Sequence, residues 1–402
     1  MKEQSPFSPG RPVPIEYFVG RIDEIKRIER ALRQSAQGTN QNIFITGERG
    51  IGKSSLASFA RYLAEREHQF IGAHSFLGSA RSVHDVCAIV FKQLLQASSG
   101  NTLFEKVKRT LTKYISSVDV FGLTVELSND ARSKESLLSN FLPVLREIIE
   151  NIKEDRKGIC LVLDDLNGIA KVPGFAHFIK SVVDEIATNQ KWLTPLTLIL
   201  VGTPERMDDL REQQPSISRI FEVVELSIMG PEESTSFFEK AFTSVGATLQ
   251  EAATEIMVKY SGGFPVLLHE VGDAVFWEDR DSSIDIRDAL FGVGVAAENV
   301  GRKYLDRQVY QTIKSKIYRS ILTKIAAHRR IMSTDEQAII RKEMLGKMSE
   351  SEKKNFGNFI QKMKKLGVLK DGEDRGTYVF TNELYGLYIA MEAGERRFSV
   401  II

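Results

Sequence analysis

Residues 42–55 read Asn-Ile-Phe-Ile-Thr-Gly-Glu-Arg-Gly-Ile-Gly-Lys-Ser-Ser, an apolar strand followed directly by the pattern G-x-x-x-x-G-K-S/T. Its three glycines allow backbone conformations that other residues rarely adopt, so successive amide N–H groups can turn inward around a phosphate. After the pattern, apolar residues recur at helical spacing, which places a positive helix N-terminus at the anion. An ordinary glycine-rich turn is the alternative, but the order of strand, loop and helix indicates a phosphate-binding loop.

Each residue type in such a loop has a defined task. Lys53 reaches the β- and γ-phosphates, and the hydroxyl of Ser54 ligates Mg2+. The candidate phosphate-binding residues are Gly47, Glu48, Arg49, Gly50, Ile51, Gly52, Lys53, Ser54 and Ser55.

The composition is that of a folded protein with two or three domains. The 402 residues are 42% hydrophobic and 27% charged, which excludes disorder for most of the chain. Cys87 and Cys160 both stand in apolar runs, so we interpret them as small buried residues of a reducing compartment rather than as a disulfide or zinc site. There is no signal-peptide core and no apolar run of membrane-spanning length, so the sequence predicts a cytoplasmic protein without a membrane partner.

Charge is distributed unevenly along the chain. Residues 301–370 contain 18 Lys and Arg against 6 Asp and Glu, a segment charge of +12. Because the whole chain carries +1, the remaining residues carry −11. The sequence therefore predicts a mildly acidic body with a basic C-terminal module.

Short apolar runs alternate with helical patterns, which predicts an α/β fold: a P-loop NTPase parallel sheet covered on both faces, with a helical lid and a C-terminal winged-helix domain. The expected strands are 42–46, 70–76, 159–164, 196–201 and 222–226. The expected domains are an extended arm at 1–14, a P-loop ATPase core at 15–228, a helical lid at 229–300, and a basic helix plus winged helix at 301–402.

Three finer predictions concern local structure. Alternation about a glycine at 118–127 predicts a hairpin inserted in the nucleotide domain. Residues 230–297 look entirely helical, and one long basic amphipathic helix is expected at 301–330. Residues 349–390 show the order helix, two short strands, helix.

A second set of polar residues completes the expected nucleotide site. The apolar run at 159–163 ends in Asp164 and Asp165, where Asp164 would hold the Mg2+ shell and Asp165 would orient or deprotonate the attacking water. Many related ATPases have Glu at the second position, so the shorter Asp predicts slow turnover. Two solvated carboxylates at a strand end are the alternative.

Two further residues have both a catalytic and a structural interpretation. Thr203, at the end of the strand 196–201, is placed to sense the γ-phosphate or the water, or else simply caps the following helix. Arg219 precedes the last strand on the far side of the domain. There it would reach a neighbouring subunit's γ-phosphate as an arginine finger, or form a surface salt bridge.

Together the motifs are similar to those of a known family. Phe18-Val-Gly-Arg21, the loop, Asp164-Asp165, Gly202-Thr-Pro-Glu and Ser261-Gly-Gly-Phe-Pro265 resemble the AAA+-related signal-transduction ATPases with numerous domains (STAND) and the ATPase module of archaeal origin-recognition initiators. The resemblance implies that ATP and ADP are the ligands, with Phe18, Val19 and Arg21 against the adenine and ribose. It also implies that Pro265 of the lid packs near the base.

One departure separates the two families. Initiator-type lids usually carry a sensor arginine near the proline, whereas the nearest basic residue here is His269, which we expect to be a packed core histidine. This favours the STAND resemblance, which implies a closed ADP state and an ATP-dependent open state that oligomerises or releases a partner. No effector domain follows in this chain, so the effector is expected to be a separate, unidentified protein.

The basic module supports two functions. Its lysines would clamp duplex DNA from a recognition helix and wing, or they would be the solvent face of an amphipathic helix that covers the ATPase core. The cations concerned are Lys353, Lys354, Lys362, Lys364, Lys365 and Arg375. We therefore expect a slowly hydrolysing regulatory ATPase switch acting on a partner protein, with a DNA-binding AAA+ initiator or loader as the alternative. A metabolic kinase is disfavoured because no acceptor-substrate motif is present.

Overall fold

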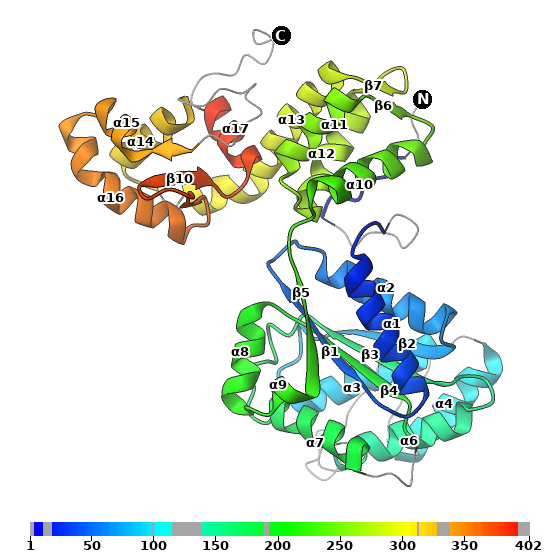
Figure 1. Ribbon diagram of the computed structural model, residues 1–402. Helices are drawn as coiled ribbons and strands as arrows, with labels where there is room; N and C mark the ends of the chain where they lie inside the picture. Colours follow the sequence, from blue (N-terminus) through cyan, green and yellow to red (C-terminus); the bar gives the residue numbers. More distant parts are fainter. Residues whose placement is uncertain are drawn as a thin grey trace. The chain divides into compact units, whose positions relative to one another are not determined.

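A computed structural model of the chain describes residues 4–10, 18–98, 100–114, 138–188, 193–311, 313–327 and 338–392 (Figure 1). These residues form two compact units. One, the P-loop unit, lies within Pro14–Ser227, and the other, the lid unit, combines residues of Met1–Val13 and Ile228–Ile402.

The P-loop unit is built on a five-stranded sheet in the order β2-β3-β4-β1-β5, with every pairing parallel. The strands are β1 (Asn42–Gly47), β2 (Phe70–Phe76), β3 (Gly158–Asp164), β4 (Leu196–Val201) and β5 (Phe221–Leu226). The central strands β1, β3 and β4 are buried along their whole length, as their nearly continuous apolar sequences require. All five strands predicted from the sequence, and the parallel sheet, are confirmed.

Helices cover both faces of this sheet (Figure 1). They are α1 (Ile22–Ala36), α2 (Lys53–Arg66), α3 (Val83–Ala97), α4 (Asn101–Tyr114), α6 (Phe141–Ile152), α7 (Phe175–Thr188), α8 (Pro204–Gln213) and α9 (Ile217–Ile220). Helix α2 packs closely on β2, since a Cβ at Gly72 would lie 2.6 Å from the Arg61 side chain. Every second residue of β2 and β3, such as Ile71, points to the same face of the sheet and packs there in one hydrophobic core with α3, α6 and α7.

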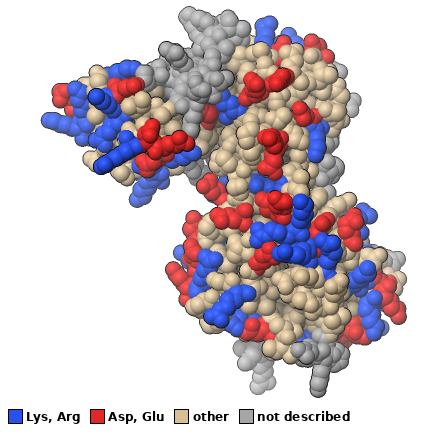
Figure 2. All heavy atoms as spheres, in the orientation of Figure 1, with Lys and Arg blue, Asp and Glu red and all other residues tan. Residues whose placement is uncertain are grey.

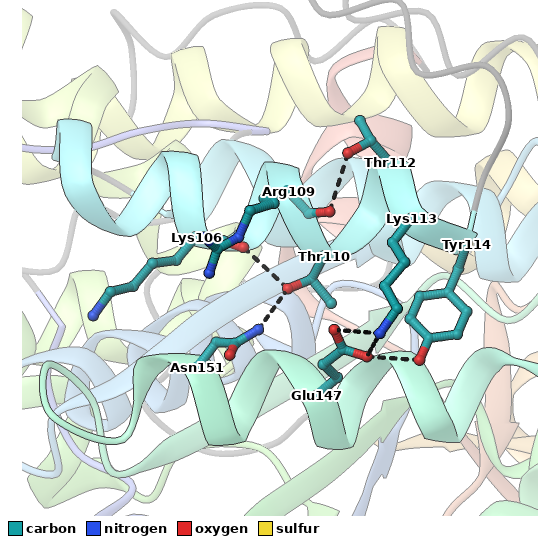
Figure 3. Close-up of polar contacts among 8 residues, drawn as sticks. All are labelled: Lys106, Arg109, Thr110, Thr112, Lys113, Tyr114, Glu147 and Asn151. Atoms are coloured by element: carbon teal, nitrogen blue, oxygen red, sulfur yellow. Dashed lines mark hydrogen bonds and ion pairs between the residues drawn. The ribbon is translucent and has the colours of Figure 1, made fainter.

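Helices α4 and α6 are joined by polar contacts at one end of the sheet (Figure 3). The Tyr114 hydroxyl donates to Glu147 at 2.6 Å, and Lys113 Nζ lies 3.0 Å from the same carboxylate. One turn further along, Asn151 donates to Thr110 Oγ1 at 2.9 Å. The hairpin predicted at 118–127 lies outside the described residues.

The lid consists mainly of four helices, α10 (Pro231–Ser244), α11 (Glu251–Ser261), α12 (Pro265–Glu278) and α13 (Ile286–Val300). The all-helical prediction was wrong in one detail, because two short strands, β6 (Thr248–Leu249) and β7 (Ser283–Ile284), pair in parallel between them. His269 is buried in α12, where burial lowers its pKa to about 4, so its prediction as a packed core histidine is confirmed.

Residues near the N-terminus dock on this lid. Residues 4–10 contain no helix or strand, as expected, but Phe7 is only 5% exposed. Its ring lies 5.1 Å from that of Phe242, and the space that it fills exists because Gly272 has no Cβ. The N–H of Ser8 donates to His269 Nδ1 at 3.1 Å. This segment is therefore part of the lid core and not a free arm.

The prediction of one long helix at 301–330 was wrong. The chain forms a π-helix, η2 (Gly301–Tyr310), leaves helical structure, and resumes as α14 (Lys316–Ala327). Between them Ile313 is buried and its carbonyl accepts a hydrogen bond from Arg319 Nε at 3.0 Å. The interruption thus buries an apolar side chain and satisfies its backbone carbonyl.

The C-terminal module contains β8 (Ile339–Ile340), α15 (Arg341–Gly346), α16 (Glu350–Lys365), β9 (Leu369–Asp371), β10 (Thr377–Phe380) and α17 (Glu383–Glu392). The predicted order of helix, two short strands and helix is confirmed for residues 349–390, whereas β8 and α15 before them were not predicted. Strands β8, β10 and β9 form an antiparallel sheet, and Phe356 and Phe359 of α16 are fully buried.

Two further observations concern membrane spans and the cysteines. Among the described residues, no helix combines the length and hydrophobicity that a membrane span requires. Cys87 and Cys160 are buried and unpaired, and burial raises the pKa of Cys160 to about 12, so both behave as the small hydrophobic residues that the sequence indicated.

Candidate nucleotide site

The predicted phosphate loop connects β1 to α2 and has the backbone expected of an anion cradle. Gly47, Gly50 and Gly52 have φ values of 144°, 84° and 94°, which only glycine adopts readily. At Gly47 the need is also steric, because an added Cβ would lie 2.7 Å from the carbonyl oxygen of Leu226 in β5. Glu48 and Arg49 are exposed, whereas Ile51 is buried and anchors the loop.

Lys53 begins α2, with Ser54 and Ser55 in its first turn. Its Nζ donates to the carbonyl oxygens of Gly47 and Glu48 at 2.8 and 2.7 Å. Burial lowers the pKa of Lys53, while Asp164 and Glu205 act in the opposite direction. The ammonium group is therefore poised over the loop with two carboxylates in its electrostatic field.

Asp164 ends β3 and is 3% exposed. The Asp165 N–H donates to its Oδ1 at 2.7 Å, and Nε2 of His74 lies 3.0 Å from its Oδ2. His74 belongs to the neighbouring strand β2 and was missed from the sequence. No local pattern identifies it, because its role depends on β2 lying next to β3.

Asp165 is exposed and has a left-handed backbone, with φ of 59°. Its Oδ1 accepts a hydrogen bond from Asn167 at 2.5 Å, and its Oδ2 lies 2.3 Å from where a Gly78 Cβ would stand. The carboxylate is thus hydrogen-bonded within the loop that follows β3 and lies close to the loop that follows β2. Its predicted role toward water remains a prediction.

Strand β4 lies between β1 and β3, so β3, the strand that bears Asp164, is not adjacent to the strand that leads into the loop. Thr203 follows β4 at the same edge, between the loop and Asp164, and is half-buried. It occupies the cap position of α8 but makes no capping hydrogen bond with its side chain. Instead, hydrogen bonding from its side chain lowers the pKa of the exposed Glu205.

The residues expected near the base lie beside α2 and the loop. Phe18 stacks on Phe59 of α2, with ring centroids 4.7 Å apart. Arg21 is 5% exposed and donates from Nη2 to the carbonyl oxygens of Ile51 at 3.3 Å and Ser227 at 2.6 Å. Arg21 therefore ties the phosphate loop to the end of β5. Val19 is half-buried.

The remaining predicted residues lie elsewhere. Arg219 is exposed on α9, just before β5 begins, and therefore at the sheet edge opposite the loop, about 20 Å away along six strand residues. Among the described residues it has no ion pair that would support its interpretation as a surface salt bridge. Pro265 is the first residue of α12, in the lid unit.

The donor set at the loop suits Mg2+. The hydroxyl of Ser54 and the buried carboxylate of Asp164 are hard oxygen donors, which Mg2+ prefers. In the described part of the chain, no three His, Cys, Asp or Glu side chains lie close enough together to hold a metal ion.

Charges on the C-terminal module are mixed. Lys and Arg gather over α14–α16 with acidic side chains among them (Figure 2). Lys353 pairs with Glu350 at 2.7 Å, and Lys364 pairs with Asp371. For Lys354, Lys362 and Lys365 no ion pair is found within the described ranges.

Comparisons with known proteins agree with this geometry. Residues 17–198 match the family model described as the AAA ATPase domain. Among solved structures, the chain is similar to the Aeropyrum pernix ORC2 protein in its ADPNP-ADP complexes, with 12% identity, a TM-score of 0.54, and coverage of 98% of this chain and 99% of that one.

Another similar structure is the Walker-type ATPase PABY2304 of Pyrococcus abyssi, with 17% identity, a TM-score of 0.49, and coverage of 92% and 96% of the two chains. No curated protein shows a significant match to the sequence. At these identities the structural likeness concerns the fold alone.

Proposed function

We propose that this chain, whose residues 17–198 match the AAA ATPase domain family, is an ATP-binding, slowly hydrolysing regulatory switch of the STAND type that acts on a separate partner protein. The observation that carries this proposal is Asp165. Its side chain is shorter than the usual Glu, accepts a hydrogen bond from Asn167, and lies close to Gly78. We expect such a site to bind nucleotide normally, while its base, already occupied by a hydrogen bond, activates the attacking water poorly.

The other residues take distinct roles in the proposal. Lys53 binds the β- and γ-phosphates, Thr203 senses the γ-phosphate from between the loop and Asp164, and Arg21 fixes the loop. Mg2+, held through Ser54 and Asp164, neutralises phosphate charge. Arg219 lies at the N-terminal ends of the strands, whereas the phosphate loop lies at their C-terminal ends, so Arg219 cannot reach the loop of its own chain. It therefore acts on the nucleotide of a neighbouring subunit, and this role requires the chain to self-associate on ATP binding.

The lid unit supplies the means of transmitting the nucleotide state. In it, α17 packs on α13 and η2 so closely that a Cβ at Gly301 would lie 2.2 Å from the Tyr388 ring. The Tyr388 hydroxyl donates to Asp306 at 2.7 Å. Lid and C-terminal module therefore move together when Pro265 responds to the nucleotide. ATP shifts the population to the extent that it binds the open state more tightly.

The surface of the module favours a protein partner over duplex DNA. Two of the five helix lysines are paired with acidic side chains. The connection between β9 and β10, which would be the wing, carries Glu373, Asp374 and Arg375, all exposed. Its two carboxylates repel a phosphate backbone. DNA binding is the alternative that the experiment must decide.

The test is ATP hydrolysis by the full chain with and without duplex DNA, at low and moderate salt. We expect slow turnover that DNA does not change. Asp165→Glu should raise the hydrolysis rate several-fold with ATP affinity unchanged, and Asp165→Asn should abolish hydrolysis but keep binding. Stimulation by DNA that fades with salt contradicts the switch and supports the initiator or loader.

Lys53→Ala tests the site that both functions share. The variant loses the phosphate contacts and should bind neither ATP nor ADP measurably. Unchanged ATP affinity in this variant contradicts the assignment of the phosphate loop itself.

A further inference from the structure

The carboxylate of Asp164 is held from two strands. One oxygen accepts from the backbone N–H of the next residue, and the other lies 3.0 Å from His74 Nε2. A carboxylate only accepts hydrogen bonds, so Nε2 of His74 carries a proton and donates a hydrogen bond to Oδ2. Each carboxylate oxygen keeps a further lone pair for a metal-bound water.

His74 itself is fixed in place. The register of β2 on β3 pairs His74 with Val162 and Phe76 with Asp164, so the two polar side chains stand diagonally on the same face. The imidazole is 10% exposed, and its ring stacks on that of Phe76 with centroids 4.6 Å apart. Strand pairing and stacking together restrict rotation of the donor.

We propose that His74 is a positioning residue that aims Asp164 at the Mg2+ shell of the bound nucleotide; this rests on the proposed ATPase function. Partners behind a metal-binding carboxylate fix its orientation, and their loss typically lowers metal affinity 10–100-fold. Without His74, the buried carboxylate loses its donor on Oδ2 and turns about its side-chain bond. The phosphate contacts of Lys53 do not involve His74 and stay intact.

The experiment uses three variants of the full chain. His74→Phe keeps a planar ring but removes the donor, and His74→Gln restores an N–H near the Nε2 position. Ser75→Ala is the matched control, because Ser75 is the adjacent β2 residue, is buried, and finds no hydrogen-bond partner for its hydroxyl among the described residues. Affinity for a non-hydrolysable ATP analogue is measured by calorimetry in EDTA and over a Mg2+ series.

We expect all four proteins to bind the analogue equally in EDTA. The Mg2+ concentration that gives half of the metal-dependent gain in analogue affinity should then be at least about tenfold higher for His74→Phe than for the wild type. For His74→Gln it should be less than about threefold higher, and Ser75→Ala should match the wild type.

Three results would overturn the proposal. If His74→Phe responds to Mg2+ like the wild type, His74 does not position the carboxylate. If the Phe and Gln variants lose affinity equally in EDTA and also melt at lower temperature, His74 serves packing alone. A wild-type protein that binds no analogue with or without Mg2+ overturns the ATPase function together with this proposal.

Discussion

Glu352 ties the exposed helix α16 to α14, and its replacement gives a quantitative test of the C-terminal module. Its Oε1 accepts from Ser320 Oγ, and its Oε2 accepts from Lys324 Nζ and the Ser349 N–H, each at 2.7 Å. The side chain is buried, and these donors, Lys324 first, lower its pKa from 4.5 to about 2. Glu352→Gln removes the charge and keeps the shape.

The magnitude follows from the pKa shift. At ~1.36 kcal/mol per pKa unit the shift corresponds to at most about 3 kcal/mol, nearer 1 after solvent screening of the half-exposed Lys324. Because the folded-state pKa is depressed, this stability is present above pH 4.5 and is lost as the pH falls toward 2. The wild type and Glu352→Gln should therefore differ most near pH 7 and converge in acid.

Hydrogen exchange of the α16 amides, corrected for intrinsic rates at each pH, measures this local stability. We expect Glu352→Gln to lower protection about 5–150-fold at pH 7, which corresponds to ~1–3 kcal/mol. Glu350→Gln is the matched control: it lies in the same first turn, but its side chain is 81% exposed, so it should cost only a few tenths of a kcal/mol. Equal effects of the two variants at pH 7, or a difference between wild type and Glu352→Gln that is as large at pH 2 as at pH 7, would refute the reasoning.

Three further outcomes are expected. Phe7→Ala should lower the stability of the lid unit by about 3–5 kcal/mol in calorimetry, because a buried aromatic ring is lost; a loss below ~1 kcal/mol contradicts its docking. Gly47→Ala should abolish ATP binding and cost about 1–3 kcal/mol, since φ is 144° and the Cβ meets the Leu226 carbonyl; normal binding in filter assays contradicts this. Arg21→Met should weaken ATP binding about tenfold or more, because two carbonyl oxygens lose a charged donor; unchanged affinity by calorimetry shows that the loop holds itself.

Strands and helices of the P-loop unit were predictable because their apolar periodicity is strong. The same signal misled at residues 301–330. Leu305, Val309 and Ile313 are buried and follow one another at four-residue spacing, so the pattern looks like one α-helix. The spacing does not reveal that the backbone there is π-helical and then leaves the helix.

Within the site, residues in contiguous motifs were predictable and those brought together by the sheet were not. The loop glycines and Asp164 belong to contiguous motifs that can be recognised in the sequence. His74 and Glu205 do not, because their relation to Asp164 and Lys53 depends on strand order and on the turn after β4. The predicted place of Arg21 against the adenine and ribose stays a prediction, and its hydrogen bonds to the carbonyl oxygens of Ile51 in the loop and of Ser227, just after β5, could not be foreseen from the sequence.

Docking of Phe7 on the lid also means that this ring is translated long before the residues against which it packs. The hydrogen bond from Ser8 to His269 spans 261 residues, and the whole P-loop unit is translated in between. At ~5–20 residues per second, roughly 13–50 s pass on the ribosome before the aromatic pocket exists. Throughout that interval the Phe7 ring has no native partner, and the lid is the last part of the first 280 residues that can complete its fold.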